Sequence, residues 1–379
     1  MLGGARGAAA PCDARCHRIC VESRHYCHSN TINTLANSSL RSRPMRPANT
    51  LLLLGASVSG FALRRRAAVA GAAGGLAAVG LSRTTPPRAM VIDSHLHVWS
   101  STFQYAPGKE PPPELGDAVA SAEALDASLK AVGADGALVV QPINYEFDHS
   151  YVASVLSTHK NFRGMALANP ADPGALAALV DGAPPGTWTG VRFNPYLWPE
   201  AARTGAWLAD GAGLALLEIC HARGLAIGVM AFQGLTPLLP SIEALLAHPK
   251  AVPVVIDHWG FPRENPGAPA APGLAFDEAA WEALLKLGRD HATVYVKLSA
   301  LFRVSREGPP YADLKPRFAA LVDAYGADRL MWGSDFPFAQ LSGGQGASLD
   351  AVAGFCADLP AGQRAAILGG TARALFKFA

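Results

Sequence analysis

The sequence predicts an α/β protein, a (β/α)8 TIM barrel preceded by an N-terminal targeting segment. From Met90 onward, short runs rich in β-branched residues alternate with helix-like runs, as in parallel sheets built from βα units. Eight such units fit in the 290 residues after position 89, and barrels of this kind usually take about 250 residues. Residues 1–89 differ in composition from the rest, which predicts a leader and one folded domain, 90–379.

The leader has the composition of a transit peptide. Residues 1–89 contain 12 Arg, no Lys and two acids, a net charge of +10, whereas the remainder carries 20 basic and 28 acidic groups, a net charge of −8. An Arg-rich, Ser- and Ala-rich, acid-poor leader is typical of organelle targeting, and we expect it to be largely disordered. The Arg triplet at 64–66 precedes a small-residue apolar run, as in signals for onward transfer across an inner plastid membrane. We therefore expect a plastid protein of the chloroplast stroma or lumen, with the mitochondrion as the alternative.

Several other features of the chain limit its partners. The apolar run at 67–81 has 15 residues, short of the roughly 20 that cross a bilayer, so we expect no stable membrane insertion. The acidic balance of the folded domain argues against a nucleic-acid partner. Four cysteines lie in the leader without the paired C-x2-C elements of a zinc module; they are Cys12, Cys16, Cys20 and Cys27. Nothing in the sequence fixes the oligomeric state.

Eight strands and at least five helices are expected after the leader. The expected strands are 91–97, 137–141, 163–168, 190–194, 225–230, 252–258, 293–298 and 329–334. The expected helices include 122–132, 214–223, 241–247, 277–289 and 314–325. The turn after the first strand, 99–113, is long and rich in Pro and aromatic residues, so it is not the Gly-rich phosphate turn of a dinucleotide-binding sheet.

The first strand carries two imidazoles two residues apart. In a regular strand, alternate side chains share a face, so Asp93, His95 and His97 are expected on one side, with Ile92 and the other apolar residues opposite. Such a pair alone is as consistent with structural histidines as with a functional site.

Polar residues also end the other strands, at the end of a barrel where active sites lie. The fourth strand supplies Arg192 and Asn194, the sixth Asp257 and His258, the seventh Lys297 and Ser299, and the eighth Ser334 and Asp335. We therefore expect these side chains to meet at one site.

With these motifs the chain resembles the amidohydrolase-related branch of the amidohydrolase superfamily, which contains sugar-acid lactonases, pyrone-dicarboxylate lactonases and metal-dependent decarboxylases. The motifs are IDSHLHVW at 92–99, GVRFNPYLWP at 190–199, VVIDHWGFP at 254–262, VYVKLSALF at 294–302, RLMWGSDFPF at 329–338 and ILGGTARALF at 367–376. They follow the family's order along the chain, with Thr371 where an Asn is more usual.

The resemblance implies a role for each of four residues. Asp335 is the implied proton-transfer group, His95 and His97 are first-strand ligands or substrate contacts, and His258 helps to activate water or polarises the scissile carbonyl. A carboxylate beside imidazoles can take a proton from water while the imidazoles stabilise the oxyanion. His258 could instead be a core histidine beneath the site.

The resemblance leaves the metal open. Metal-binding members place a His after strand five or a Lys after strand four, and neither is present in 226–232 or 191–194. His95, His97 and Asp335 could still hold one zinc or manganese ion as three protein ligands. Metal-free catalysis is the equally weighted alternative.

Substrate contacts are expected from a further group of residues. Arg192 is the main candidate, because a guanidinium can bind a carboxylate through two parallel hydrogen bonds. Asn194, Tyr196 and Arg303 are further candidates, and Trp99, Trp198 and Trp259 line a pocket or cover the barrel mouth. We expect Lys297 to pair with a buried acid. The expected substrate is a small anionic carboxylate.

Three functions remain in view from the sequence. The first is hydrolysis of a small carboxylated lactone or related cyclic ester or amide. The second is decarboxylation at the same site, which requires a tightly bound divalent ion. The third is a barrel that binds a ligand without catalysis, which the joint presence of His95, His97, His258 and Asp335 disfavours.

Overall fold

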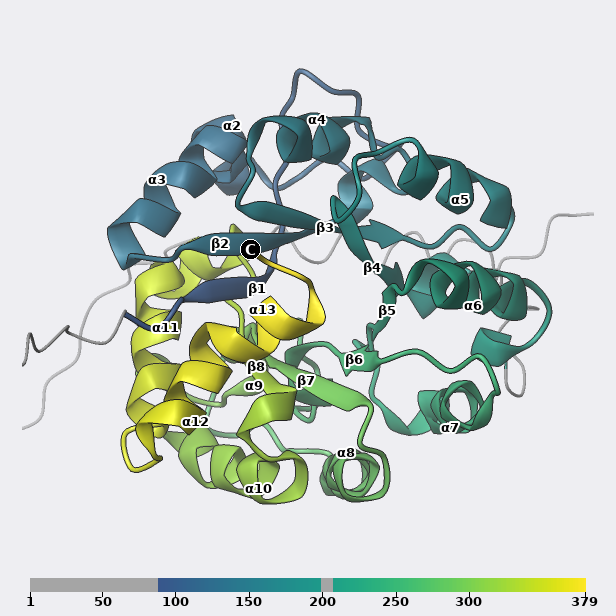
Figure 1. The fold of residues 1–379 in the computed structure, drawn as a ribbon. Coiled ribbons are helices and arrows are strands. Elements are labelled where there is room, and N and C mark those ends of the chain that lie inside the picture. Colours follow the sequence, from purple (N-terminus) through teal and green to yellow (C-terminus); the bar gives the residue numbers. More distant parts are fainter. Residues whose placement is uncertain (1–87, 199–206) are drawn as a thin grey trace, which may run out of the picture. The chain divides into compact units, whose positions relative to one another are not determined.

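A computed structural model of the chain describes residues 88–198 and 207–379. Eight parallel strands, hydrogen-bonded in chain order, curl into a barrel (Figure 1), which confirms the predicted fold. The strands are β1 (Ile92–Leu96), β2 (Gly136–Val140), β3 (Phe162–Leu167), β4 (Trp188–Phe193), β5 (Ala226–Val229), β6 (Val254–Ile256), β7 (Val294–Leu298) and β8 (Leu330–Trp332). Each overlaps its predicted range. The leader prediction for 1–89 lies outside the described residues, apart from its last two.

Helices surround the barrel and connect successive strands (Figure 1). They are α2 (Asp117–Ala120), α3 (Ala122–Val132), α4 (Ser150–Thr158), α5 (Pro173–Asp181), α6 (Gly211–Arg223), α7 (Leu239–Ala247), α8 (Glu278–Asp290), α9 (Leu301–Val304), α10 (Lys315–Tyr325), α11 (Gly344–Phe355), α12 (Ala361–Ala365) and α13 (Thr371–Leu375). Within the described part of the chain, no helix combines the length and hydropathy needed to cross a bilayer.

Capping residues determine where the helices begin and end. Helix α3 has the predicted bounds because the Ser121 side chain accepts from the backbone N–H of Ala124 and Gly133 ends the helix at a φ of 68°. Helix α6 begins at Gly211, three residues before the prediction, because the Asp210 side chain accepts from its N–H. Side-chain caps satisfy donors that the first turn of a helix leaves unpaired.

Backbone hydrogen bonds close the barrel between its first and last strands. The N–H of His97 donates to the carbonyl of Phe336 at 2.7 Å, and the N–H of Asp335 donates to the carbonyl of His95 at 2.8 Å. Leu96 and Phe336 also form a parallel bridge. The backbone of the two first-strand histidines is therefore fixed directly against that of Asp335.

The prediction that Asp93 shares a face with His95 is wrong. Asp93 pairs with Ala137 and Leu96 with Val139, so β1 has one more residue than β2 between these points, which is a β-bulge. A bulge breaks the alternation of side chains between the two faces of a strand. Asp93 points out of the barrel and accepts from Gln345 of α11 at 2.6 Å, while His95 points inward.

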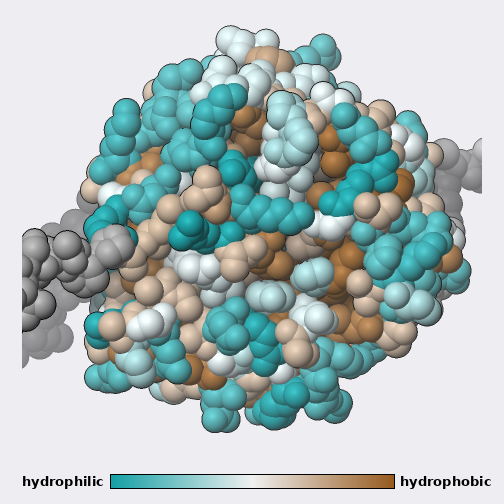
Figure 2. Space-filling model, viewed as in Figure 1, coloured by the Kyte–Doolittle hydropathy of each residue, from teal (hydrophilic) through white to brown (hydrophobic). Residues whose placement is uncertain are grey.

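The C-terminal segment closes the amino-terminal opening of the barrel. Ala372, Phe376 and Phe378 pack on the apolar cluster inside the barrel, which includes Ile92 and Met165. Helix α13 crosses this opening in Figure 1. From outside, this face has hydrophilic residues around its rim and smaller hydrophobic areas between them (Figure 2). The opposite, carboxyl-terminal end is left for the polar residues.

Glycines allow close packing in the apolar cluster at the amino-terminal end of the barrel, which we call the apolar floor. A Cβ on Gly190 of β4 would lie 2.7 Å from Cε of Met165, and one on Gly228 of β5 would lie 3.0 Å from its Sδ. Met165 therefore occupies the space that side chains at these two positions would take.

Gly369 provides a test of the packing of the C-terminal segment. A Cβ at this position would lie 2.2 Å from the backbone oxygen of Met90, just before β1. Because neither backbone is free to move, Gly369→Ala should reduce the free energy of unfolding by more than about 1 kcal/mol. Chemical unfolding followed by circular dichroism measures this loss.

Gly362 in α12 is the matched control, because a Cβ there meets nothing within 4 Å. Gly362→Ala should leave stability unchanged or raise it by up to about 1 kcal/mol. Equal stability of the two variants would contradict the proposed close contact at Gly369.

Candidate active site

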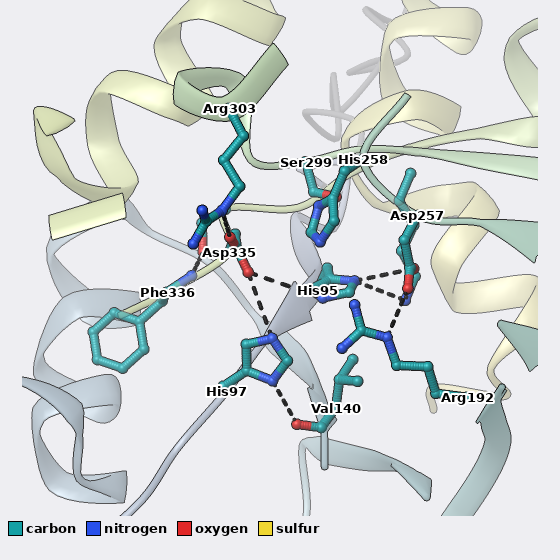
Figure 3. Close-up of polar contacts among 12 residues, drawn as sticks. His95, His97, Val140, Arg192, Asp257, His258, Ser299, Arg303, Asp335 and Phe336 are labelled. Atoms are coloured by element: carbon teal, nitrogen blue, oxygen red, sulfur yellow. Dashed lines mark hydrogen bonds and ion pairs between the residues drawn. The ribbon is translucent and has the colours of Figure 1, made fainter. Parts of the chain in front are cut away.

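Side chains from the ends of four strands meet at the carboxyl-terminal end of the barrel (Figure 3). His95 belongs to β1 and His97 follows it directly, Arg192 belongs to β4, and Asp335 lies in the segment after β8. Asp257 and His258 follow β6. Because the barrel brings all strand ends to one rim, residues far apart in the sequence become neighbours.

Asp335 lies at the centre of this group. Its Oδ1 is 3.5 Å from Nε2 of His97 and 4.0 Å from Nε2 of His95, and its Oδ2 is 3.5 Å from Nε of Arg303. The residue adopts a φ of 65°, a left-handed conformation that Asp tolerates better than most side chains. One carboxylate thus faces two imidazoles and a guanidinium.

The pKa of Asp335 is below its ordinary value. Burial alone raises the pKa of this carboxyl, but the neighbouring His258, His97 and Arg303 together lower it. The carboxylate is therefore ionised at neutral pH and can accept a proton.

His97 has a defined orientation. Its Nδ1 lies 2.8 Å from the carbonyl oxygen of Val140, and since a carbonyl only accepts, Nδ1 carries a proton. In the neutral ring, Nε2 is then a lone pair that faces Oδ1 of Asp335. Two acceptors that face each other suit a shared proton, a cation or a water molecule between them.

A buried ion cluster lies beneath His95. Oδ2 of Asp257 accepts from Nε of Arg192 at 2.9 Å, and its Oδ1 lies 3.2 Å from both Nζ of Lys297 and Nδ1 of His95. His95, Asp257 and Lys297 have no exposed surface. Burial raises the pKa of Asp257, but Lys297, His95 and Arg192 outweigh it and hold that pKa well below the ordinary value.

The expected acid partner of Lys297 is therefore Asp257, whose role the sequence left unassigned. A lysine within an otherwise apolar strand needs an acidic partner when it is buried. The apolar sequence around Lys297 was therefore the one indication that a carboxylate such as Asp257 would be its partner. His95 itself remains neutral, because burial and the charge of Lys297 lower its pKa well below the ordinary value.

His258 lies against the other face of the His95 ring. The ring centroids are 4.3 Å apart, and Nδ1 of His258 lies 2.7 Å from the hydroxyl of Ser299. Burial and the neighbouring His95 lower the pKa of His258 well below its ordinary value. The structure thus places His258 at the site, as the catalytic interpretation expects. The ring is also packed and hydrogen-bonded, as the interpretation of a core histidine expects.

Arg303 stands at the opening of the site. Its guanidinium lies between the rings of Phe302 and Phe338, 5.0 Å from each centroid, and its side chain is 16% exposed. Two aromatic faces hold the group in place by cation–π attraction while leaving its edge in contact with solvent.

Two other predicted contacts, Asn194 and Tyr196, are held by hydrogen bonds within the protein. The Asn194 side chain accepts from the backbone of Tyr196, and the hydroxyl of Tyr196 accepts from the backbone of Gln233 at 2.7 Å. Trp99 and Trp259 are fully buried in the core.

Three of the side chains could hold a metal ion. His95, His97 and Asp335 each offer one ligand atom, and these atoms lie within 4.8 Å of one another. Imidazole nitrogens and carboxylate oxygens are ligands of zinc. His95 Nε2 is buried with no hydrogen-bond partner among the described residues, as expected of an atom that is completed by an ion or a substrate.

Comparison with known sequences places the chain among hydrolases. The sequence profile of the amidohydrolase family matches residues 92–378. An L-fucono-1,5-lactonase from Burkholderia ambifaria is 28% identical over 260 residues, 66% of this chain and 82% of that protein. A 4-sulfomuconolactone hydrolase from Rhizobium radiobacter is 29% identical over 255 residues, 65% of this chain and 75% of that protein.

Solved structures share the fold. A Pseudomonas putida protein described as a 2-pyrone-4,6-dicarboxylic acid hydrolase is 28% identical with a TM-score of 0.53, covering 76% of this chain and 98% of its own. A zinc-containing amidohydrolase from Burkholderia multivorans is 24% identical with a TM-score of 0.61, covering 77% of this chain and all of its own.

Removing the carboxylate of the ion cluster should be costly. Asp257→Ala leaves the cations Arg192 and Lys297 buried without their partner, and a broken buried ion pair typically costs about 3–5 kcal/mol. Thermal and chemical unfolding should both record this loss.

The exposed pair between Arg223 and Asp181 is the matched control. Asp181→Ala should change stability little, because solvent screens that pair. A similar, small loss in both variants would show that the buried charges find other partners.

Proposed function

The chain belongs to the amidohydrolase family, and we propose that it hydrolyses a small carboxylated lactone or a related cyclic ester. The protein is thus an enzyme of a hydrolase family. The observation that carries the proposal is the ionised Asp335 carboxylate facing two imidazoles. The names of the two lactone hydrolases reported above support the same class of reaction.

In the first step, water attacks the lactone carbonyl. Oδ1 of Asp335 and Nε2 of His97 are acceptors that face each other, so one water molecule can donate a hydrogen bond to each. Asp335 then takes a proton as the new carbon–oxygen bond forms, which is general base catalysis. We place the developing oxyanion beside His95 and His258, whose ring centroids lie 4.3 Å apart.

In the second step, the ring opens. The oxyanion reforms the carbonyl, the bond to the ring oxygen breaks, and that oxygen takes the proton from Asp335. The product is a hydroxy acid, and the carboxylate returns to its starting state. Stabilising the oxyanion by fixed donors is the larger contribution to rate in such reactions.

A divalent ion is compatible with these side chains. The residue types and spacing of His95, His97 and Asp335 fit one zinc or manganese ion, with three protein ligands. Such an ion supplies Lewis-acid polarisation of the carbonyl and lowers the pKa of water.

Two guanidinium groups support an anionic substrate. Nε of Arg192 donates a hydrogen bond to Asp257, and the terminal nitrogens of Arg192 point toward the histidines in Figure 3. Arg303 lies on the opposite side, next to Asp335. A guanidinium binds a carboxylate through parallel, charge-assisted hydrogen bonds.

We also propose that the protein is delivered to a plastid. The net charge of +10 and the near absence of acids in residues 1–89 support this. The location of a fluorescent protein fused behind residues 1–89, expressed in plastid-containing cells, tests it against the mitochondrial alternative.

Asp335→Asn should abolish turnover without unfolding the barrel. The amide has nearly the same shape but cannot take a proton from water, and loss of a general base typically lowers kcat by about 100- to 10,000-fold. The assay follows acid release from a panel of sugar-acid and pyrone-dicarboxylate lactones.

Circular dichroism and a melting curve of Asp335→Asn serve as the control for folding. Near-normal kcat in a folded variant would exclude Asp335 as the base.

Arg303→Met should discriminate between substrates by charge. Loss of a hydrogen bond to a charged group costs about 1.5–3 kcal/mol, so kcat/KM for a carboxylated lactone should fall roughly 10- to 100-fold more than for an uncharged one. Comparing two substrates on one variant cancels any effect of the substitution on Asp335.

Arg303→Lys is the matched control, since it keeps the charge and loses the planar pair of donors. It should show a smaller loss. Equal losses on both substrates would mean that Arg303 does not contact the carboxylate.

A further inference from the structure

Lys297 is a buried cation that none of the proposed steps uses. It belongs to β7 and has no exposed surface. Its Nζ lies 3.1 Å from Nδ1 of His95, 3.2 Å from Oδ1 of Asp257 and 3.8 Å from Sδ of Met165. Beneath it, the ring centroid of Phe376 is 5.9 Å away.

The apolar floor leaves this ammonium few places to donate. Met165 and Phe376 are weak acceptors, and Asp257 is shared with Arg192. Among the described residues, Nδ1 of His95 is the other nitrogen or oxygen atom that lies within hydrogen-bond distance of Nζ. Lys297 is thus held between the ion cluster and the first-strand imidazole.

Two partners of opposite kind compete for Nδ1 of His95. An ammonium has only donors, so a hydrogen bond from Lys297 requires Nδ1 to be a lone pair. A carboxylate has only acceptors, so a hydrogen bond to Asp257 requires a proton on Nδ1. The contact with Lys297 has hydrogen-bond geometry. Oδ1 of Asp257 lies 3.2 Å from Nδ1, but among the described residues no donor meets it in hydrogen-bond geometry.

We propose that Lys297 is a positioning residue that holds His95 in the tautomer with its proton on Nε2. His95 then offers a hydrogen-bond donor to the carbonyl oxygen of the substrate, and that same nitrogen has to give up its proton before it can bind a metal ion. The buried Nε2, which has no hydrogen-bond partner among the described residues, is the donor that the oxyanion satisfies.

The two histidines of the first strand therefore have opposite tautomers. Val140 places the proton of His97 on Nδ1, which turns an acceptor toward the attacking water. Lys297 places the proton of His95 on Nε2, which turns a donor toward the carbonyl. The role in catalysis rests on the proposed hydrolysis, but the tautomer and its effect on metal binding do not.

The first experiment is nitrogen NMR of the full chain labelled at histidine nitrogens, with His95 assigned from the signals missing in His95→Asn. The wild type should show an unprotonated Nδ1 and a protonated Nε2 at His95. A protonated Nδ1 in the wild type would overturn the proposal, whatever the substrate is.

Lys297→Met tests whether Lys297 determines the tautomer of His95. The side chain is of similar length and has no donor, so Asp257 becomes the only polar partner of Nδ1, and the proton should move to Nδ1. Zinc affinity, measured by calorimetry on chelator-treated protein, should then rise about 10- to 100-fold, the usual range for partners that orient metal ligands. In the absence of zinc, kcat should fall.

Lys286→Met is the matched control, because Lys286 lies exposed on α8, away from the site. It should change neither zinc affinity nor the His95 signals. A folded Lys297→Met with the wild-type tautomer would contradict the assigned role of Lys297. If that variant does not fold, the wild-type spectrum alone decides. A confirmed tautomer without any lactonase activity would reject the proposed reaction and keep the inference.

Discussion

The buried carboxylate of Asp257 is the constraint on which the site depends. It follows β6 and interacts with Arg192 from β4, Lys297 from β7 and His95 from β1. A charge inside a protein is stable only when it is paired and hydrogen-bonded. Because one carboxylate serves partners from three other strands, it fixes their relative positions in the barrel as well as their charges.

The remainder of the barrel divides into two parts around this cluster. Below it, Met165 and the C-terminal phenylalanines form an apolar floor. Above it lie the polar side chains of Asp335, His97 and Arg303, of which Arg303 is the most exposed. The low dielectric of the floor strengthens the electrostatic interactions of the cluster, and the packing of the C-terminal segment thus affects the site from the opposite end.

The sequence was informative where a local pattern determines the structure. Alternating strand and helix runs predicted the barrel and the position of every strand, and the identity of strand-end residues predicted which side chains meet. It failed at Asp93, because the β-bulge that turns this residue outward depends on pairing with a distant strand. The sequence also left Asp257 without a role, because the partners of this carboxylate lie far away along the chain. Within the same cluster, Lys297 contacts His95, which is 202 positions away.

Residue types alone could not show what each imidazole does. Sequence makes His95 and His97 equivalent members of one motif, yet a backbone carbonyl faces Nδ1 of one and a lysine faces Nδ1 of the other. The direction of a single hydrogen bond decides whether a ring nitrogen accepts or donates. The distinction between a metal ligand and an oxyanion donor at this site therefore lies in the residues behind the histidines, and the same His-x-His motif can serve either chemistry.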